Sequence, residues 1–567
     1  MFRKGYVMKK DEIIYIAVIF TVFAMIVFFG FPITDIFDES MYATSITATT
    51  NIFAPVLNGT DFFGANGLFF GMSKIFAALL PGHPQFAVKL PGLIVFGILA
   101  ASVYFTGKTI EKPPLGFICT ICVLFSAGFV FFSKTLSPDF ISLCFAMTAA
   151  IFGFIPVCDK NDKTNKLCYF AFWMFCTFSV LTKGVTPAFT ALFTVLFVHI
   201  KSKSLKLFFT PKNIFPGMIF AFLFFGIYAF TEFKIFGKSY FSAVLKTCVP
   251  ILFAPSETKF FINNLKALEI FFFAGILPHL PYLFGFSPEI TESFFTTPER
   301  NIDKFTVFCT SGLLIGLIFT LLNAGVAEIL SMIFFGALFT GIFTYKAFFG
   351  EQKFKSVYSA TSFVFFAILV LTAVSGILSY LFIPEIAKNF ATPFIIPFLI
   401  IISAVSMPGL LFSAMKNPKL IFSAHILFGI LLTVFLPGIF KTYTDFTGDR
   451  DIVKFGIIAA KKGLTITTYD LVDKYSLVYY SKNNVKFNHK IPHDKIERHL
   501  SNSKNILITL KNKDLTDFDK LFAYEIVETG KQYSLITNIT KLPPSVIIEN
   551  KQTLKDSETK PFSKTER

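Results

Sequence analysis

Two adjacent carboxylates, Asp38 and Glu39, follow the first long apolar run of the sequence, which extends from Ile13 to Phe31. A run of this length and composition predicts a membrane helix, so both acids lie just past its end. A charge this close to hydrocarbon is costly unless it is solvated, paired or used in chemistry. Position alone therefore leaves two interpretations, a solvated cap at a helix end or a catalytic carboxylate.

Two short polar turns between later apolar runs also carry charged groups. Asp139 ends the turn that starts at Ser133, and Lys183 lies between Thr182 and Gly184. A carboxylate can orient or deprotonate an acceptor, and a lysine ammonium can hold a phosphate as a compact point charge. The structural alternatives are a helix N-cap for Asp139 and an interfacial lysine with a snorkelling side chain for Lys183.

The amino-acid composition indicates that membrane helices position these charged groups. The 567 residues are 54% hydrophobic and only 16% charged, and many windows of 18 residues or more carry no charge. These features predict an α-helical polytopic membrane protein. The net charge of +16 comes mainly from lysines in short loops beside apolar runs, which orient the chain and contact anionic lipids. No basic-aromatic module is present, so we expect no nucleic-acid partner.

The apolar runs predict about thirteen membrane helices. We place them at residues 13–31, 88–106, 115–133, 139–157, 167–181, 185–200, 214–230, 267–287, 305–322, 326–345, 357–377, 391–407 and 419–437. The basic loops fall on one side if the N-terminus is cytoplasmic, although segment 288–304 is acidic and breaks this pattern. Asp38, Asp139 and Lys183 then share the outer face, together with everything after residue 438.

The predicted organisation is a transmembrane domain over residues 1–440, an extracytoplasmic α/β domain over 445–545 and a disordered tail over 546–567. Within the small domain we expect helices at 451–461 and 471–480, strands at 465–468 and 506–510, and a helical piece at 518–523. Two outer loops are long, 32–87 and 231–266. The first contains a short apolar segment, 66–80, that we interpret as an interfacial helix.

The second outer loop contains Lys234 and Lys238, which either attract a phosphate or form a solvated surface. Cys119 and Cys122 lie inside a predicted helix without a second cysteine pair or a nearby histidine. We therefore interpret them as small buried hydrophobic residues, and we expect no metal site there.

Five short motifs occur in a fixed order over roughly residues 10–200. They are Asp38-Glu39-x-x-Tyr42-Ala43, Pro55-Val56-Leu57-Asn58-Gly59, Phe86-Ala87-Val88-Lys89-Leu90-Pro91-Gly92, Ser137-Pro138-Asp139 and Leu181-Thr182-Lys183-Gly184. This series resembles the PMT/ArnT-like membrane glycosyltransferases, which have a GT-C fold and include protein O-mannosyltransferases and lipid A aminoarabinose transferases. The resemblance implies an inverting transferase that uses a polyprenyl-phosphate sugar on the outer face of a bacterial inner membrane. The implied acceptor is a lipid-linked glycan, a lipid A-like molecule or a protein.

The resemblance also implies site residues. Asp38 would be the central catalytic carboxylate, and Glu39 and Asp139 would shape the same cavity. Lys183, Lys234 and Lys238 are the candidates for binding the donor phosphate. The resemblance leaves a divalent cation open as a cofactor but assigns no residue of this chain as its ligand.

The sequence departs from the family at one motif. The family places an acid and the residues Lys-Pro-Pro-Leu shortly after the Asn58-Gly59 pair, whereas this chain has Ala65-Asn66-Gly67 there. A similar run, Glu111 to Leu115, falls in the first cytoplasmic loop and is interpreted as an ordinary basic loop. Two alternatives to an active enzyme therefore stay open, a lipid or glycan transporter and a catalytically degenerate lipid-binding relative.

Overall fold

The computed structural model describes residues 10–28, 39–49, 51–52, 55–57, 60–61, 65–159, 161–237, 279–323, 325–350, 352–382, 395–468, 474–482, 485–486, 507–515 and 524–538. The chain divides into two units. The first contains Met1–Ile33 and Ser45–Phe440, and the second contains Thr34–Thr44 and Lys441–Arg567. The acidic stretch at the start of the chain is therefore grouped with the C-terminal part.

Nine helices in the described part of the chain are long and apolar enough to cross a membrane. They are α1 (Lys10–Phe28), α4 (Pro84–Ile110), α7 (Pro138–Cys158), α11 (Pro211–Phe236), α17 (Asn301–Asn323), α18 (Val326–Phe349), α19 (Gln352–Phe382), α21 (Ile395–Ala414) and α22 (Pro418–Thr447). This confirms the prediction of an α-helical polytopic membrane protein. α8 (Asp162–Thr182) and α9 (Thr186–Lys201) coincide with two further predicted spans.

Two predicted spans differ in the structure. The segment predicted as one helix over 115–133 is divided into α5 (Pro113–Leu124) and α6 (Ala127–Phe132), because Ser126 between them is extended. The Ser126 hydroxyl lies 3.3 Å from His279 Nε2, so the break lets a polar group pair inside the bundle. The predicted span 267–287 begins outside the described residues and ends in two short helices, α15 (Leu280–Gly285) and α16 (Ser287–Phe295).

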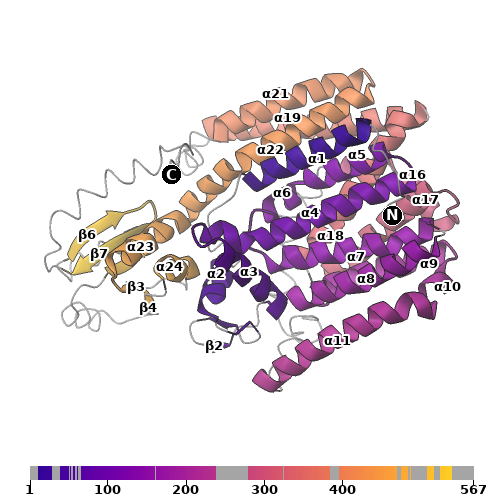
Figure 1. The fold of residues 1–567 in the computed structure, drawn as a ribbon. Helices are drawn as coiled ribbons and strands as arrows, with labels where there is room; N and C mark the ends of the chain where they lie inside the picture. Colours follow the sequence, from indigo (N-terminus) through magenta and orange to yellow (C-terminus); the bar gives the residue numbers. More distant parts are fainter. Residues whose placement is uncertain are drawn as a thin grey trace. The chain divides into compact units, whose positions relative to one another are not determined.

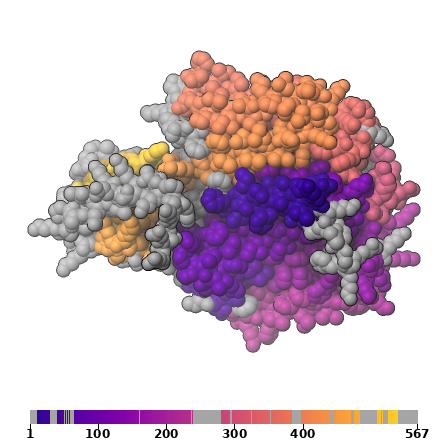
Figure 2. All heavy atoms as spheres, turned by 45° about the horizontal axis from the view of Figure 1, so that its top comes forward, coloured from indigo at the N-terminus to yellow at the C-terminus, as the bar shows by residue number. Residues whose placement is uncertain are grey.

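Helix α7 is the centre of the first unit because it is apolar around its whole circumference. It packs against α4, α8, α9 and α18, which run alongside it in Figure 1. α1 instead exposes apolar side chains such as Phe20 and Phe28. In Figure 2, α1 forms an indigo strip on the surface of this unit, between purple and orange helices. Such a surface suits contact with lipid.

The two ends of α7 lie at opposite ends of the helix bundle. Asp139 lies in its first turn, and Lys304 of α17 donates a hydrogen bond to the carbonyl of Val157 in its last turn, at 3.1 Å. With 21 residues, α7 is about 30 Å long. Sites at its two ends are therefore separated by roughly the thickness of a bilayer core.

Several short elements complete the first unit. The hairpin of β1 (Val56–Leu57) and β2 (Thr60–Asp61) precedes α3 (Gly67–Leu79), and α10 (Leu205–Phe208) precedes α11. α2 (Glu39–Ala48) begins in the second unit and ends in the first. α3 has 13 residues and is too short to cross a bilayer, as expected for the segment 66–80.

The second unit contains a mixed sheet with the strand order β4-β3-β5-β7-β6 among the described residues. Its strands are β3 (Ile466–Thr468), β4 (Val485–Lys486), β5 (Leu507–Lys511), β6 (Tyr524–Thr529) and β7 (Tyr533–Asn538). β3 pairs in parallel with β4 and β5, whereas β7 pairs antiparallel with β5 and β6. α24 (Tyr475–Tyr480) lies between β3 and β4 in the chain.

Helix α23 (Asp449–Lys462) closes the core of this sheet. Its buried residues Ile452, Phe455 and Ala459 form a cluster with Leu507 and Leu535 of the strands. The predicted elements 451–461, 465–468, 471–480 and 506–510 correspond to α23, β3, α24 and β5. The helical piece predicted at 518–523 lies outside the described residues.

Candidate active site

The first turn of α7 presents Asp139 to the end of α8. Ser137, at the N-cap of α7, accepts a hydrogen bond from the backbone N–H of Phe140 at 3.2 Å. The cap is therefore supplied by Ser137, which leaves the Asp139 carboxylate available for other contacts. Asp139 Oδ2 lies 3.4 Å from Lys183 Nζ, and both side chains are about a quarter exposed, at 26% and 22%.

Lys183 is the residue that ends α8, where a cation also complements the negative end of the helix. The structure thus brings together two residues that stand 44 positions apart in the sequence and that the motifs predicted to share one site. A carboxylate beside an ammonium can accept a proton or orient an acceptor, while the ammonium attracts an anion.

Two buried lysines at the same end of the bundle were given no role from the sequence. Lys89 of α4 donates to the carbonyl of Lys134 at 3.0 Å, and Lys134 donates to the carbonyl of Ile26 at 3.1 Å. Lys134 lies in the turn before α7 and is only 3% exposed, and burial lowers its pKa to about 8. Buried cations are rare at a membrane edge and mark functional positions. Lys89 lies in one of the five motifs and Lys134 in the turn before Ser137, but sequence spacing does not reveal burial.

The segment that replaces the Lys-Pro-Pro-Leu motif is fixed to the end of α8. The side-chain amide of Asn66 donates to the carbonyl of Val180 at 2.7 Å, and its backbone N–H donates to the carbonyl of Thr182 at 2.9 Å. The segment therefore lies beside Lys183 without contributing a lysine.

Helix α11 reaches the same end of the bundle. The backbone N–H of Gly67 donates to the hydroxyl of Tyr228 at 3.0 Å, and Glu232 is buried one turn further along α11. Lys234, a predicted phosphate-binding residue, is exposed in the last turn of α11, with its ammonium 5.0 Å from the centre of the Phe230 ring. Its predicted role stays a prediction.

Glu39 belongs to the second unit. It is 1% exposed in the first turn of α2, where a carboxylate is favoured by the helix dipole. Thr44 of the same helix donates to the carbonyl of Tyr475 in α24 at 3.3 Å. Burial raises the pKa of Tyr479 to about 12, and the charge of Glu39 adds to this shift. The start of α2 is thus attached to α24, which the sequence did not indicate.

Two predicted site residues, Asp38 and Lys238, lie outside the described residues. Among the residues that the structure does describe, no group of three or more His, Cys, Asp or Glu side chains is arranged to hold a metal ion. The predicted divalent cation therefore stays a proposal, and no chemical step below depends on it.

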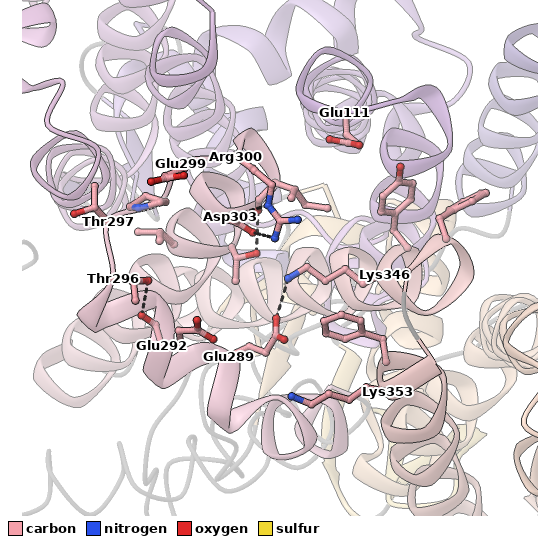
Figure 3. Close-up of a pocket in the computed structure, with 18 of the residues that line it drawn as sticks. Glu111, Glu289, Glu292, Thr296, Thr297, Glu299, Arg300, Asp303, Lys346 and Lys353 are labelled. Atoms are coloured by element: carbon pink, nitrogen blue, oxygen red, sulfur yellow. Dashed lines mark hydrogen bonds and ion pairs between the residues drawn. The ribbon is translucent and has the colours of Figure 1, made fainter.

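A cavity of about 730 Å³ lies at the other end of the bundle (Figure 3). It is lined by Glu111, Lys112 and Asp303, and Asp303 is adjacent to Lys304, whose ammonium contacts the last turn of α7. The run that begins with Glu111 and Lys112 is thus separated from Asp139 by the length of α7. The cavity therefore does not belong to the site at Asp139.

No protein-family model matches the chain, and no curated protein sequence matches it. Among solved structures, the fold is similar to that of ArnT from Cupriavidus metallidurans bound to undecaprenyl phosphate, with a TM-score of 0.68. The two chains are 10% identical, and the match covers 93% of this chain and 98% of ArnT. ArnT in the apo state gives a TM-score of 0.65 at 10% identity, covering 93% of this chain and 97% of that one.

The chain therefore has an ArnT/PMT-like GT-C fold, as the ordered motifs predicted. At 10% identity the similarity defines the fold, and one fold can support several activities.

Proposed function

We propose that the chain is a membrane glycosyltransferase that uses a polyprenyl-phosphate sugar. The observation that carries this proposal is the Asp139–Lys183 pair, which lies with two buried lysines at one end of a GT-C bundle. A bundle end of this kind offers a carboxylate for the acceptor and cations for a phosphate within one membrane interface. The ArnT structure with the same fold contains undecaprenyl phosphate, which supports a lipid-phosphate donor here.

The proposed reaction is a single displacement at the anomeric carbon. A bond forms between the acceptor oxygen and that carbon while the bond from the carbon to the phosphate oxygen breaks. The acceptor proton passes to a carboxylate, and the polyprenyl phosphate leaves with its negative charge. The motif resemblance assigns the central carboxylate to Asp38 and gives Glu39 and Asp139 a part in shaping the same cavity.

Lys183 is proposed to stabilise the leaving phosphate. Lys89 and Lys134, at the same end of the bundle, add positive charge there. Lys234 and Lys238 are further candidates for binding the phosphate. Lysines fit this task because charge develops on the phosphate oxygens as the bond to the sugar breaks. The acceptor is a lipid-linked glycan, a lipid A-like molecule or a protein. We place the reaction on the outer face of a bacterial inner membrane, with the N-terminus in the cytoplasm.

The proposal is tested by reconstituting the full chain in liposomes with a panel of radiolabelled polyprenyl-phosphate sugars and a cell-envelope acceptor extract. We expect transfer from one donor class, and a loss of at least about 100-fold in Asp38→Asn. Asp162→Asn, which changes an exposed carboxylate in the first turn of α8, is the matched control and should retain full transfer.

Equal transfer by the wild type and Asp38→Asn would remove Asp38 from the mechanism. If no donor supports transfer, the movement of labelled lipid across the liposome membrane is measured. Movement of the lipid would indicate a transporter, and binding without movement would indicate a lipid-binding relative. Either of those results contradicts the proposed enzyme.

A further inference from the structure

The cavity at the Glu111 end of the bundle has a different chemistry from the site at Asp139. Its wall is formed by the turn between α4 and α5, by α16, by the first turns of α17 and α19, and by the last turn of α18. α18 and α19 are membrane-crossing helices by length and composition, so the junction between them lies at the level of the lipid headgroups. A volume of about 730 Å³ is in the range of small-molecule sites.

Two ion pairs lie in the wall of this cavity. Lys346 Nζ lies 2.8 Å from Glu289 Oε2 and joins α18 to α16, with both side chains largely buried. Arg300 donates two hydrogen bonds to Asp303, from Nε at 2.8 Å and from a terminal nitrogen at 3.1 Å. These contacts pair four of the charged groups with one another, and the Lys346–Glu289 pair also joins two helices of the wall.

Five further charged side chains line the cavity, and none of them makes an ion pair with the described residues. They are the carboxylates of Glu111, Glu292 and Glu299 and the ammonium groups of Lys112 and Lys353. All five residues are exposed. The cavity therefore presents charges of both signs to whatever enters it.

Glu292 and Glu299 lie apart from Lys353, whereas Glu111 lies at the upper right of Figure 3, on the same side of the cavity as Lys353. Figure 3 shows Glu292 and Glu299 on the left of the cavity, on and after α16, and Lys353 on the right, at the start of α19. Phe349, at the end of α18, is 60% exposed beside the basic side and offers an apolar surface. A ligand that fits this arrangement carries an ammonium group at one end, a phosphate at the other and an apolar extension.

We propose that this cavity binds a zwitterionic group of the phosphoethanolamine class, such as the headgroup of an amine-bearing phospholipid. The ammonium donates hydrogen bonds to Glu292 and Glu299, and the phosphate is held by Lys353. A primary amine is expected to bind better than a quaternary one, because only the primary amine has N–H groups that donate hydrogen bonds to the carboxylates. Lys346 Nζ lies 5.4 Å from the centre of the Phe354 ring in the cavity wall.

The site does not depend on glycosyl transfer, because about 30 Å of α7 separates it from Asp139. Its test uses the full chain, purified in detergent and stripped of lipid. Native mass spectrometry then measures binding of three short-chain phospholipids with identical acyl chains and ethanolamine, choline or glycerol headgroups. Soluble phosphoethanolamine and inorganic phosphate are added separately as competitors.

We expect the ethanolamine lipid to bind about tenfold more tightly than the other two, the gain typical of a charge-assisted contact. The double variant Glu292→Gln/Glu299→Gln should lose this preference, and Lys353→Gln should weaken both the ethanolamine and the glycerol lipid. Asp162→Asn and Lys212→Gln, exposed charges outside the cavity, are matched controls and should behave like wild type.

Competition by soluble phosphoethanolamine, but not by inorganic phosphate, would show that the zwitterion itself is recognised. Competition only by an intact lipid would assign the site to the lipid headgroup and its chains. Equal binding of the three lipids overturns the proposal. So does equal competition by inorganic phosphate, or an unchanged preference in the double glutamate variant when its melting temperature matches that of wild type.

Discussion

Asp139 Oδ2 lies 3.4 Å from Lys183 Nζ, so the first turn of α7 is joined to the end of α8 by a charged pair. Each side chain keeps about a quarter of its surface exposed, at 26% for Asp139 and 22% for Lys183. An ion pair with this exposure contributes only about 0–1 kcal/mol to stability. Loss of this pair should therefore change stability little, so an effect of either substitution on transfer can be told apart from unfolding.

Replacing Lys183 with Met is expected to lower glycosyl transfer by about 100-fold, because a leaving phosphate loses one stabilising cation. Asp139→Asn should lower it by about tenfold or more, and the melting temperature should change little in both variants. The control is Lys454→Met, which breaks a pair of similar exposure in the second unit, where Lys454 Nζ lies 2.6 Å from Glu528. Unchanged transfer by Lys183→Met would rule out the proposed phosphate contact.

Lys134 should make stability depend on pH between about 8 and 10.5. Burial lowers its folded-state pKa from 10.5 to about 8. In this window the unfolded chain keeps a proton that the folded chain has lost, so stability rises with pH. Lys134→Met lacks this titration, and the stability of wild type relative to the variant should increase across the window. Thermal unfolding of both proteins at several pH values measures the difference, and parallel profiles would contradict the expectation.

The contact between α4 and α5 depends on two glycines. A Cβ on Gly116 would collide with the carbonyl oxygen of Tyr104, and a Cβ on Gly107 would lie 2.5 Å from Gly116 Cα. Gly116→Ala should therefore destabilise the bundle by about 1–3 kcal/mol through overpacking. Gly226→Ala in α11 is the matched control, since no atom lies within 4 Å of its added Cβ. It should be neutral or slightly stabilising, by up to about 1 kcal/mol in helix propensity.

The second unit offers a similar comparison at the two ends of α23. Gly448 has a φ of 76° and Gly463 a φ of 63°, so alanine is strained at either position. A Cβ on Gly448 would also collide with the Tyr533 ring, whereas the space around Gly463 is open. Gly448→Ala should therefore weaken protection of α23 in hydrogen exchange on the full chain more than Gly463→Ala, by about 1–3 kcal/mol. Equal losses of protection in the two variants would mean that the Tyr533 ring moves away from the added methyl group without a cost in free energy.

Hydropathy predicted most of the first unit, because burial in lipid requires long apolar helices. It did not predict the break at Ser126, which depends on the distant His279. The predicted α/β elements near the C-terminus were correct where the structure describes them, since their short segments have clear periodicity. The sheet order was not predictable, because strand pairing is a contact between distant segments.

The site was predictable in part. Motif order placed Asp139 and Lys183 together, and the structure confirms that they are in contact. Burial of Lys89 and Lys134 could not be inferred, because a lysine beside an apolar run usually extends its ammonium to water. The attachment of α2 to α24 was also invisible in the sequence, since Thr44 and Tyr475 are 431 positions apart.

That hydrogen bond has a consequence for the order in which the protein matures. Chains are synthesised at about 5–20 residues per second, so Thr44 waits on the order of 20–90 s before Tyr475 exists. During that time, the stretch that begins with Glu39 has no α24 to attach to. Helix α2 is therefore among the first parts to be synthesised, but it makes this contact only after α24 has been synthesised. A chain that terminates before α24 would therefore lack the partner of Thr44.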